Sequence, residues 1–345
     1  MTSTPPHDFA HSIIYLFLYS STVIINKYVL SVLCFTYPTI YQGWQTLVGA
    51  LLLRLILYKS SWLAMSPTPL DKPGFISLLP SFLFFVAGIV ASSKALANIS
   101  VGMFLCLHNT LCSVLYLLEV FPSMRREGNI SNPPPQLKAV AETSISRIGV
   151  LAALLTLLTA LAAVISDLEI NFSESPYLWL MVSLSCVAVQ RLHSRIADAR
   201  YTDVDRLYCC YVFSVVVLAP ASLYLEEAFE VLHFPHASRL DFMGACLLVG
   251  VLALLLSLHT IKFQTHRHFS RVDAVGRLVT ALVSVVVFTD ETRQATAALL
   301  LTNLGLGLLV PGVRSISPDP ADRWPAARPD LPDDTQTLLA VDTQS

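Results

Sequence analysis

Two cationic side chains interrupt long apolar stretches of this chain, and they are the residues best suited to chemistry. Lys27 lies within the apolar run 13–33, and Arg277 lies within the run 272–288. A cation in hydrocarbon costs about 3 kcal/mol on insertion scales, so such residues usually face a bundle interior and pair with an anion. We find no acidic residue deep in these runs, and we therefore expect a bound ligand to supply the anion. Removing either unpartnered cation should then leave the fold intact.

Phosphate is the anion that these two side chains suit best. Lysine offers a compact point charge, and arginine offers two parallel donors to phosphate oxygens. Asn26 adds an amide beside Lys27, and Gly276 beside Arg277 would let a ligand approach the backbone closely. Two alternatives stay open. Lys27 could extend to the membrane interface. Arg277 would also lie at the interface if the membrane span that contains it began later in the sequence.

Further amide and aromatic side chains could contact the organic part of a ligand. They are Tyr41, Gln42, Gln45, Asn109, Tyr208 and Tyr211. The first three lie three and four residues apart, so they fall on related faces of one helix. The last two share a face and could stack on a base. Hydrogen bonding between helices and an aromatic belt at the membrane boundary are the structural alternatives.

The composition predicts a membrane protein. The chain is 54% hydrophobic and 13% charged, whereas a soluble domain carries about 25% charged residues. Because a membrane span needs about 20 apolar residues and lipid offers the backbone no water, we predict an all-α fold with ten transmembrane helices. An even count fits two inverted repeats of five helices. The predicted spans are 11–33, 37–58, 74–93, 101–121, 147–166, 175–192, 207–224, 241–261, 272–289 and 294–313.

The distribution of lysine and arginine predicts how the chain is oriented. Most of the 22 fall on one set of connections, and the opposite set holds only Lys94, Arg239 and Arg293. Cytosolic connections are the basic ones, so both termini should be cytosolic. We predict a cytosolic N-terminus, a helical domain, a Pro-rich cytosolic linker within it and a disordered cytosolic tail. Their bounds are 1–10, 11–313, 122–146 and 314–345.

Short motifs add modification and sorting signals but no catalytic chemistry. Asn98 and Asn171 begin glycosylation sequons on predicted lumenal loops. Asp334, Leu338 and Leu339 form a dileucine-like sorting signal in the tail. The seven cysteines show no metal-ligand spacing, and no cluster of histidine and acids lies at one depth, so neither a cofactor nor an enzyme is expected. The near-zero net charge gives no sign of nucleic-acid binding.

The stretch 26–47 resembles the nucleotide-sugar transporters of the drug/metabolite transporter superfamily. Its segments Asn26–Leu30, Phe35–Thr39 and Gln42–Leu47 carry the resemblance, with weaker pieces at 167–172 and 211–216. The chain looks most like the vertebrate transmembrane protein 241 group, which is similar to Golgi GDP-mannose transporters. The resemblance implies a ten-helix Golgi antiporter that exchanges a nucleotide sugar for a nucleoside monophosphate by alternating access. For this group it implies UDP-N-acetylglucosamine and UMP.

The resemblance also implies two binding motifs. GDP-mannose transporters carry an aromatic–Tyr–Asn–Asn motif in the seventh span, where this chain keeps Tyr208 but has Cys209 and Cys210. A phosphate-binding lysine in the ninth span is matched by Arg277. Cysteine supplies only a weak acceptor for the N1 and N2 donors of guanine, which favours uridine. A GDP-mannose or sugar-phosphate carrier and a non-transporting scaffold or sorting protein are the alternatives. Membrane lipid and a second copy, as a homodimer, are the other candidate partners.

Overall fold

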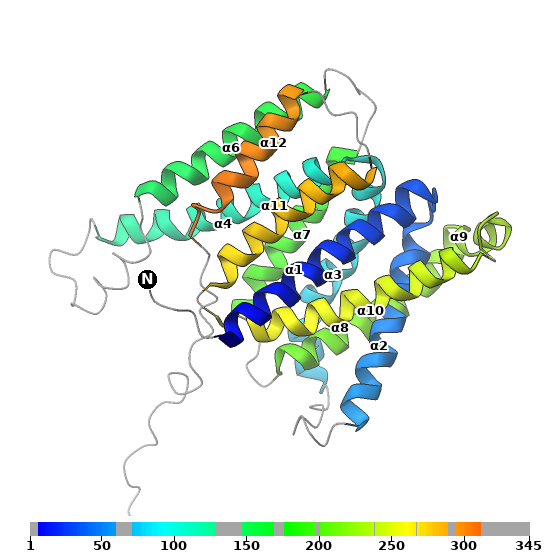
Figure 1. Ribbon diagram of the computed structural model, residues 1–345. Coiled ribbons are helices and arrows are strands. Elements are labelled where there is room, and N and C mark those ends of the chain that lie inside the picture. Colours follow the sequence, from blue (N-terminus) through cyan, green and yellow to red (C-terminus); the bar gives the residue numbers. More distant parts are fainter. Residues whose placement is uncertain are drawn as a thin grey trace, which may run out of the picture. The chain divides into compact units, whose positions relative to one another are not determined.

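The protein is built from long helices. The computed structural model describes residues 6–59, 71–127, 147–168, 176–196, 201–237, 239–266, 268–288 and 294–311, and no strand occurs among them. A π-helical turn, Tyr28–Val32, continues the first helix, and two short helices, α9 (Glu227–Glu230) and η3 (Val231–His233), precede α10. The long helices (Figure 1) are α1 (Pro6–Lys27), α2 (Pro38–Lys59), α3 (Lys72–Asn98), α4 (Val101–Glu127), α6 (Arg147–Leu168), α7 (Pro176–Ile196), α8 (Asp203–Tyr224), α10 (Leu240–Phe263), α11 (Phe269–Phe288) and α12 (Gln294–Gly307).

Each predicted apolar run coincides with one long helix, which confirms the all-α class. Within the described residues, seven helices are long and apolar enough to cross a membrane, namely α1 with its π-helical turn, α2, α3, α4, α6, α8 and α10. Helix α12 is a shorter apolar helix, and α11 carries Arg271, Asp273 and Arg277 in its first half. The protein is therefore a multi-pass membrane protein, and the count of ten spans stays a prediction.

The helix ends differ from the predicted segment boundaries. Helix α1 begins at Pro6, so it includes part of the predicted N-terminal segment 1–10. Helix α4 continues to Glu127, into the predicted linker 122–146. The remainder of that linker, and the predicted tail 314–345, lie outside the described residues.

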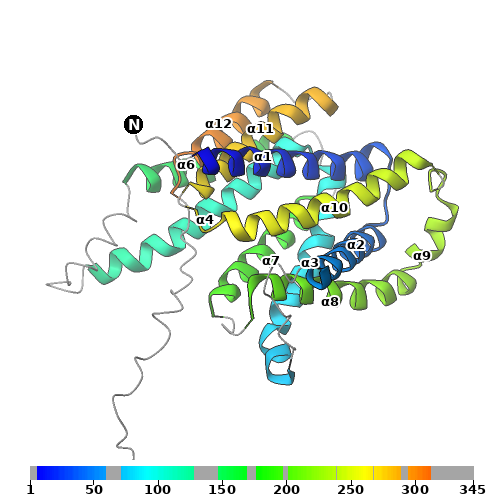
Figure 2. The same cartoon turned by 60° about the horizontal axis from the view of Figure 1, so that its bottom comes forward.

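The helices pack in pairs that are distant in sequence. Helix α1 lies between α10 and α11, as Figures 1 and 2 both show, and α4 packs on α6, α11 and α12. Helix α3 packs along α7, and α2 lies against α8 and α10. These pairings bring the first and the ninth predicted spans together, so the two helices that carry Lys27 and Arg277 are direct neighbours.

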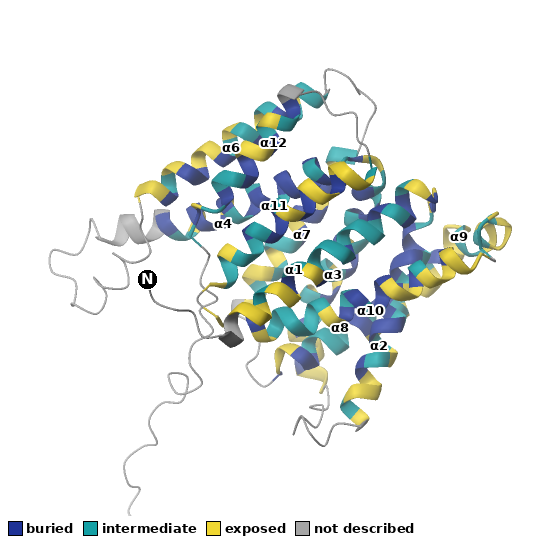
Figure 3. Ribbon diagram, in the orientation of Figure 1, coloured by how far each residue is buried: buried dark blue, intermediate teal, exposed yellow. Residues whose placement is uncertain are grey.

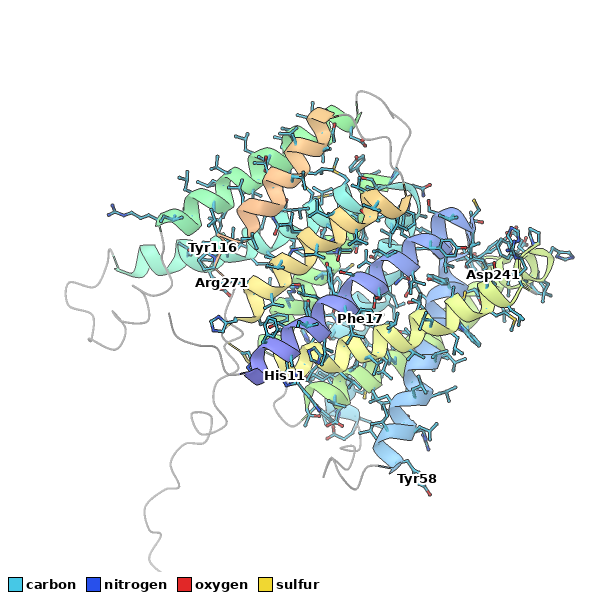
Figure 4. The ribbon with its side chains drawn as sticks, in the orientation of Figure 1. His11, Phe17, Tyr58, Tyr116, Asp241 and Arg271 are labelled. Atoms are coloured by element: carbon cyan, nitrogen blue, oxygen red, sulfur yellow. The ribbon has the colours of Figure 1, made fainter. Side chains whose placement is uncertain are left out.

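Several polar side chains are buried among the apolar core of this bundle, and many large apolar side chains are exposed on its outside. Ser113, Thr156 and Asn303 are fully buried, whereas Phe17 and Val286 are 66% and 80% exposed. Figure 3 shows exposed residues along the outer side of α6, and Figure 4 labels Phe17 on α1. Large apolar surfaces of this kind suit contact with lipid, where small polar residues hold helices together.

Candidate functional site

Arg277 forms a buried ion pair on α11. Its Nη1 donates to Oδ2 of Asp273, one helical turn earlier, at 2.6 Å. The other oxygen of Asp273 accepts a hydrogen bond from the Tyr15 hydroxyl of α1 at 2.7 Å. The expectation that no acidic residue lies deep in this run is therefore wrong. The local signal was the spacing of four residues between Asp273 and Arg277, which places both on one helical face.

A second arginine approaches this pair from α7. Nη1 of Arg277 also donates to the Cys112 sulfur of α4 at 3.6 Å, and Nη1 of Arg191 donates to the same sulfur at 3.9 Å. Among the described residues, the buried Nε of Arg277 has no hydrogen-bond partner. A buried donor of a charged group is costly to leave unpaired, so it marks a place where an anion would be stabilised.

Gly276 faces helix α1. A Cβ atom at this position would lie 3.4 Å from a methyl carbon of Leu16 and 3.6 Å from the ring of Tyr19, which are ordinary contact distances. The hydroxyls of Ser20 and Thr280 meet at 2.8 Å on the same helix pair. In this structure α1 therefore covers the side of α11 where the sequence predicted a ligand approaching the backbone.

Lys27 binds the end of another helix. Its ammonium donates to the carbonyl oxygens of Leu96, Ala97 and Ile99 at 2.9, 3.3 and 2.9 Å. These carbonyls end helix α3, where the last turn lacks helical donors. Lys27 is buried, so the side chain does not extend to an interface. The expectation of an unpartnered cation is wrong for Lys27 too, because three backbone carbonyls accept from its ammonium.

Three of the amide and phenol groups near Lys27 bond to one another. Oδ1 of Asn26 accepts hydrogen bonds from the Tyr41 hydroxyl at 2.9 Å and from the Gln45 amide at 3.0 Å. Gln42 donates to the hydroxyl of Ser93 on α3. These contacts join α1, α2 and α3, in agreement with the interhelical alternative, and ligand contact by these residues stays a prediction.

Tyr208 and Tyr211 lie in a different group of helices. The ring of Tyr211 packs so closely on α2 that a Cβ atom on Gly49 would lie 2.7 Å from it. Its hydroxyl lies 3.4 Å from Ser257 of α10. The Tyr208 hydroxyl accepts from Arg54 of α2, also at 3.4 Å. The tyrosines are thus grouped with α2 and α10, whereas Arg277 contacts Asp273 of its own helix and Cys112 of α4.

Asn109 joins three helices. Its amide donates to the backbone and side-chain oxygens of Asn303 on α12 at 2.9 and 3.1 Å, and Asn303 donates in turn to the carbonyl of Thr156 on α6. This is the interhelical alternative again.

The modification and sorting motifs gain little from the structure. Asn98 is exposed at the end of α3, where its amide nitrogen donates to the Lys94 carbonyl. Asn171 and the tail residues Asp334, Leu338 and Leu339 lie outside the described residues. Glycosylation and sorting stay predictions.

Sequence reasoning missed Tyr15, Cys112 and Arg191. Tyr15 and Cys112 sit in apolar runs without a local pattern, and Arg191 lies at the basic, predicted cytosolic end of the span 175–192. Only the packing of α1 and α4 against α11, and of α7 against α4, brings these three residues to the neighbourhood of Arg277.

Similarity to known proteins extends over most of the chain, although no family model matches it. The mouse protein named UDP-N-acetylglucosamine transporter TMEM241 is 33% identical over 297 residues, which are 85% of this chain and 92% of the mouse protein. Its Xenopus laevis homologue is 32% identical over 85% of this chain and 93% of its own length. GDP-mannose transporter 2 of Emericella nidulans is 22% identical over 86% of this chain and 84% of its own length. The chain belongs to the nucleotide-sugar transporter family.

Proposed function

We propose that this protein is a Golgi antiporter that moves UDP-N-acetylglucosamine into the lumen in exchange for UMP. The names of the mouse and frog relatives support UDP-N-acetylglucosamine, because both proteins are similar to this chain over 85% of its length. The relatives named GDP-mannose transporters are 22% and 24% identical, so GDP-mannose is the weaker candidate.

The observation that carries the proposal is the buried guanidinium of Arg277. Its Nη1 is held by Asp273, while its Nε has no partner in the described part of the chain. Arginine binds phosphate through pairs of parallel N–H donors. A nucleotide diphosphate sugar brings about two negative charges. Their attraction to a fixed cation is stronger in a low-dielectric site than it would be in water. Gly276 and the more distant Asn26, Tyr41, Gln42, Gln45, Asn109, Tyr208 and Tyr211 remain candidate contacts of this substrate.

The pairing of the helices supports ten spans in two inverted repeats. Suppose that the first repeat is α1, α2, α3, α4 and α6, and that these correspond in order to α7, α8, α10, α11 and α12. Exchanging the two repeats then converts the contact of α3 with α7 into that of α10 with α1, and both contacts are present. The contact of α2 with α10 likewise becomes that of α8 with α3, and the pairs α2–α8, α4–α11 and α6–α12 map onto themselves. The α4–α11 contact, where Cys112 meets Arg277, then lies near the symmetry axis, where transporters of this kind bind substrate.

Orientation and location belong to the same proposal. Both termini would be cytosolic in the Golgi membrane, as the basic connections predict. Fusing a reporter to each terminus and testing its protection from protease in sealed Golgi vesicles measures this. A protected terminus would contradict the proposed orientation but not the proposed substrate.

Transport by the purified full-length chain tests the function. Liposomes containing the protein and loaded with UMP should take up labelled UDP-N-acetylglucosamine, and unloaded liposomes should take up much less. Arg271→Gln is the matched control, because Arg271 is exposed at the start of α11 (Figure 4) and lies outside the proposed site. If no UDP-, GDP- or CMP-sugar enters above the level of empty liposomes, the scaffold alternative replaces the carrier.

A further inference from the structure

We infer that Arg191 of α7 is a second phosphate-binding residue, which with Arg277 of α11 holds the diphosphate of the substrate on either side of Cys112. This rests on the proposed function and assigns the residues that distinguish a diphosphate from a monophosphate. The family motifs discussed above include neither Arg191 nor Cys112.

The two guanidinium groups converge although they come from different helices. Both Nη1 atoms donate to the Cys112 sulfur, at 3.9 Å from Arg191 and 3.6 Å from Arg277. A single ligand placed at that sulfur is therefore within reach of both arginines. In the proposed repeats α7 belongs to the second half and α4 to the first, so such a ligand would contact both halves, as alternating access requires.

The arrangement is poorly explained as a structural contact. Asp273 compensates one of the two positive charges, and a thiol, a weak hydrogen-bond acceptor, compensates little of the other. Two like charges in a membrane protein repel each other more strongly than they would in water. Arg277 is only 6% exposed, and its Nε finds no partner in the residues that the structure describes. A diphosphate would supply strong acceptors to both groups and remove the repulsion.

Asp273 and Tyr15 hold Arg277 in position for this role. The carboxylate binds Nη1 of Arg277 at 2.6 Å with one oxygen and accepts from the Tyr15 hydroxyl at 2.7 Å with the other. Its orientation is thus fixed from both α11 and α1. The remaining donors of Arg277 keep one orientation, which lowers the entropy lost when phosphate binds. Arg191 is exposed in this structure, so its guanidinium is accessible to a ligand.

Binding of uridine, UMP and UDP to the purified full-length chain tests the inference. Arg191→Gln should weaken UDP binding by about tenfold or more, because a charge-assisted hydrogen bond is lost. The binding of UMP should be weakened less, and the binding of uridine should be unaffected. Arg191→Lys should recover part of the lost UDP affinity. The control Arg271→Gln should bind all three normally. Unchanged UDP affinity in Arg191→Gln, or an equal loss for uridine, overturns the role of Arg191.

Alkylation of Cys112 gives a second measurement. If Arg191 had only a structural role, UDP would not change the alkylation of Cys112. N-ethylmaleimide labelling is followed residue by residue by peptide mass spectrometry. UDP should protect Cys112 in the wild type, uridine should not, and protection should weaken in Arg191→Gln. The exposed Cys34 serves as the internal control, whose labelling should not respond to UDP. Cys112 labelling that is absent, or that is equal with and without UDP, contradicts a ligand at the sulfur.

The two proposals can fail separately. If the wild type transports nucleotide sugars and Arg191→Gln does so equally well, only the second arginine is wrong. If the wild type binds neither UDP nor UMP, both the carrier function and the diphosphate site are wrong.

Discussion

The ion pair of Arg277 and Asp273 changes what a substitution at Arg277 should do. Both side chains are largely buried, at 8% and 15% exposure. Removing one member of a buried pair leaves the other charge uncompensated, which is strongly destabilising, whereas removing both is often neutral. A loss of transport in a single variant would therefore mix an effect on substrate binding with an effect on the fold.

A double variant separates the two effects. Arg277→Gln should abolish exchange. It should also lower the free energy of unfolding by about 3–5 kcal/mol, which is seen as a lower melting temperature. Arg277→Gln combined with Asp273→Asn should restore most of the stability while exchange stays absent, and Arg277→Lys should keep part of the exchange. Thermal unfolding in detergent and uptake by liposomes are measured on the same preparations. Wild-type exchange in the stable double variant would rule out a phosphate role for Arg277.

Lys27 should behave as a structural residue. The sequence alone predicts that its removal leaves the fold intact, but its ammonium satisfies three carbonyls at the end of α3. Lys27→Met leaves these carbonyls unsatisfied in the protein interior, at a cost of about 1–3 kcal/mol. We expect a lower melting temperature and lower expression, with a partial rescue by Lys27→Arg. A variant with unchanged stability and a raised Km would instead favour direct contact with substrate.

At the scale of the element, the sequence predicts where helices lie better than which side chains meet. Apolar runs are a local property, so each predicted run became a helix. The partners of Lys27 lie about 70 residues away on α3, because this hydrogen bond depends on the packing of α1 against α3. Arg277 and Asp273 lie on one helix, and their pairing could have been predicted from spacing. The contacts of Cys112 with Arg191 and Arg277 could not, since three helices create them.

The contact of α4 with α12 depends on a glycine. A Cβ atom on Gly307 would lie 2.2 Å from Oδ1 of Asn109, whereas one on Gly305, in the same helix, would meet no atom of the described residues within 4 Å. Gly307→Ala should therefore displace the Asn109 amide from Asn303 and cost about 1–3 kcal/mol. Gly305→Ala should be neutral or slightly stabilising. Melting temperatures of the two variants measure the difference, and equal values would show that α12 moves aside freely.

At the scale of the whole molecule, two groups of helices carry the candidate binding residues. Arg277, Arg191 and Cys112 belong to α11, α7 and α4, and Tyr208 and Tyr211 belong to α8, beside α2 and α10. Phosphate recognition and base recognition would then use different helices. In a transporter with moving halves, the relative positions of these helices can change during the cycle. The choice of base should be adjustable without loss of phosphate binding.

Cys210 is a poor position for testing that choice. It is buried in a cluster with Leu78, Phe82 and Tyr201, so an asparagine there would place an amide among apolar side chains. Cys209 is only partly buried at the edge of this cluster. Of the two positions where the resemblance predicts asparagines, Cys209 is therefore the one that can be changed with the fold intact.

Uridine nucleotides should compete for transport better than guanosine nucleotides. Guanine presents N1 and N2 donors that need an amide or carboxylate acceptor, and a cysteine sulfur is a weak one. In liposomes loaded with UMP, external UMP should inhibit uptake of UDP-N-acetylglucosamine more strongly than GMP does. Cys209→Asn should narrow this difference by improving GMP competition, while the exposed control Arg271→Gln should leave the difference unchanged. GMP inhibition that equals or exceeds UMP inhibition in the wild type would transfer the assignment to a guanosine nucleotide sugar.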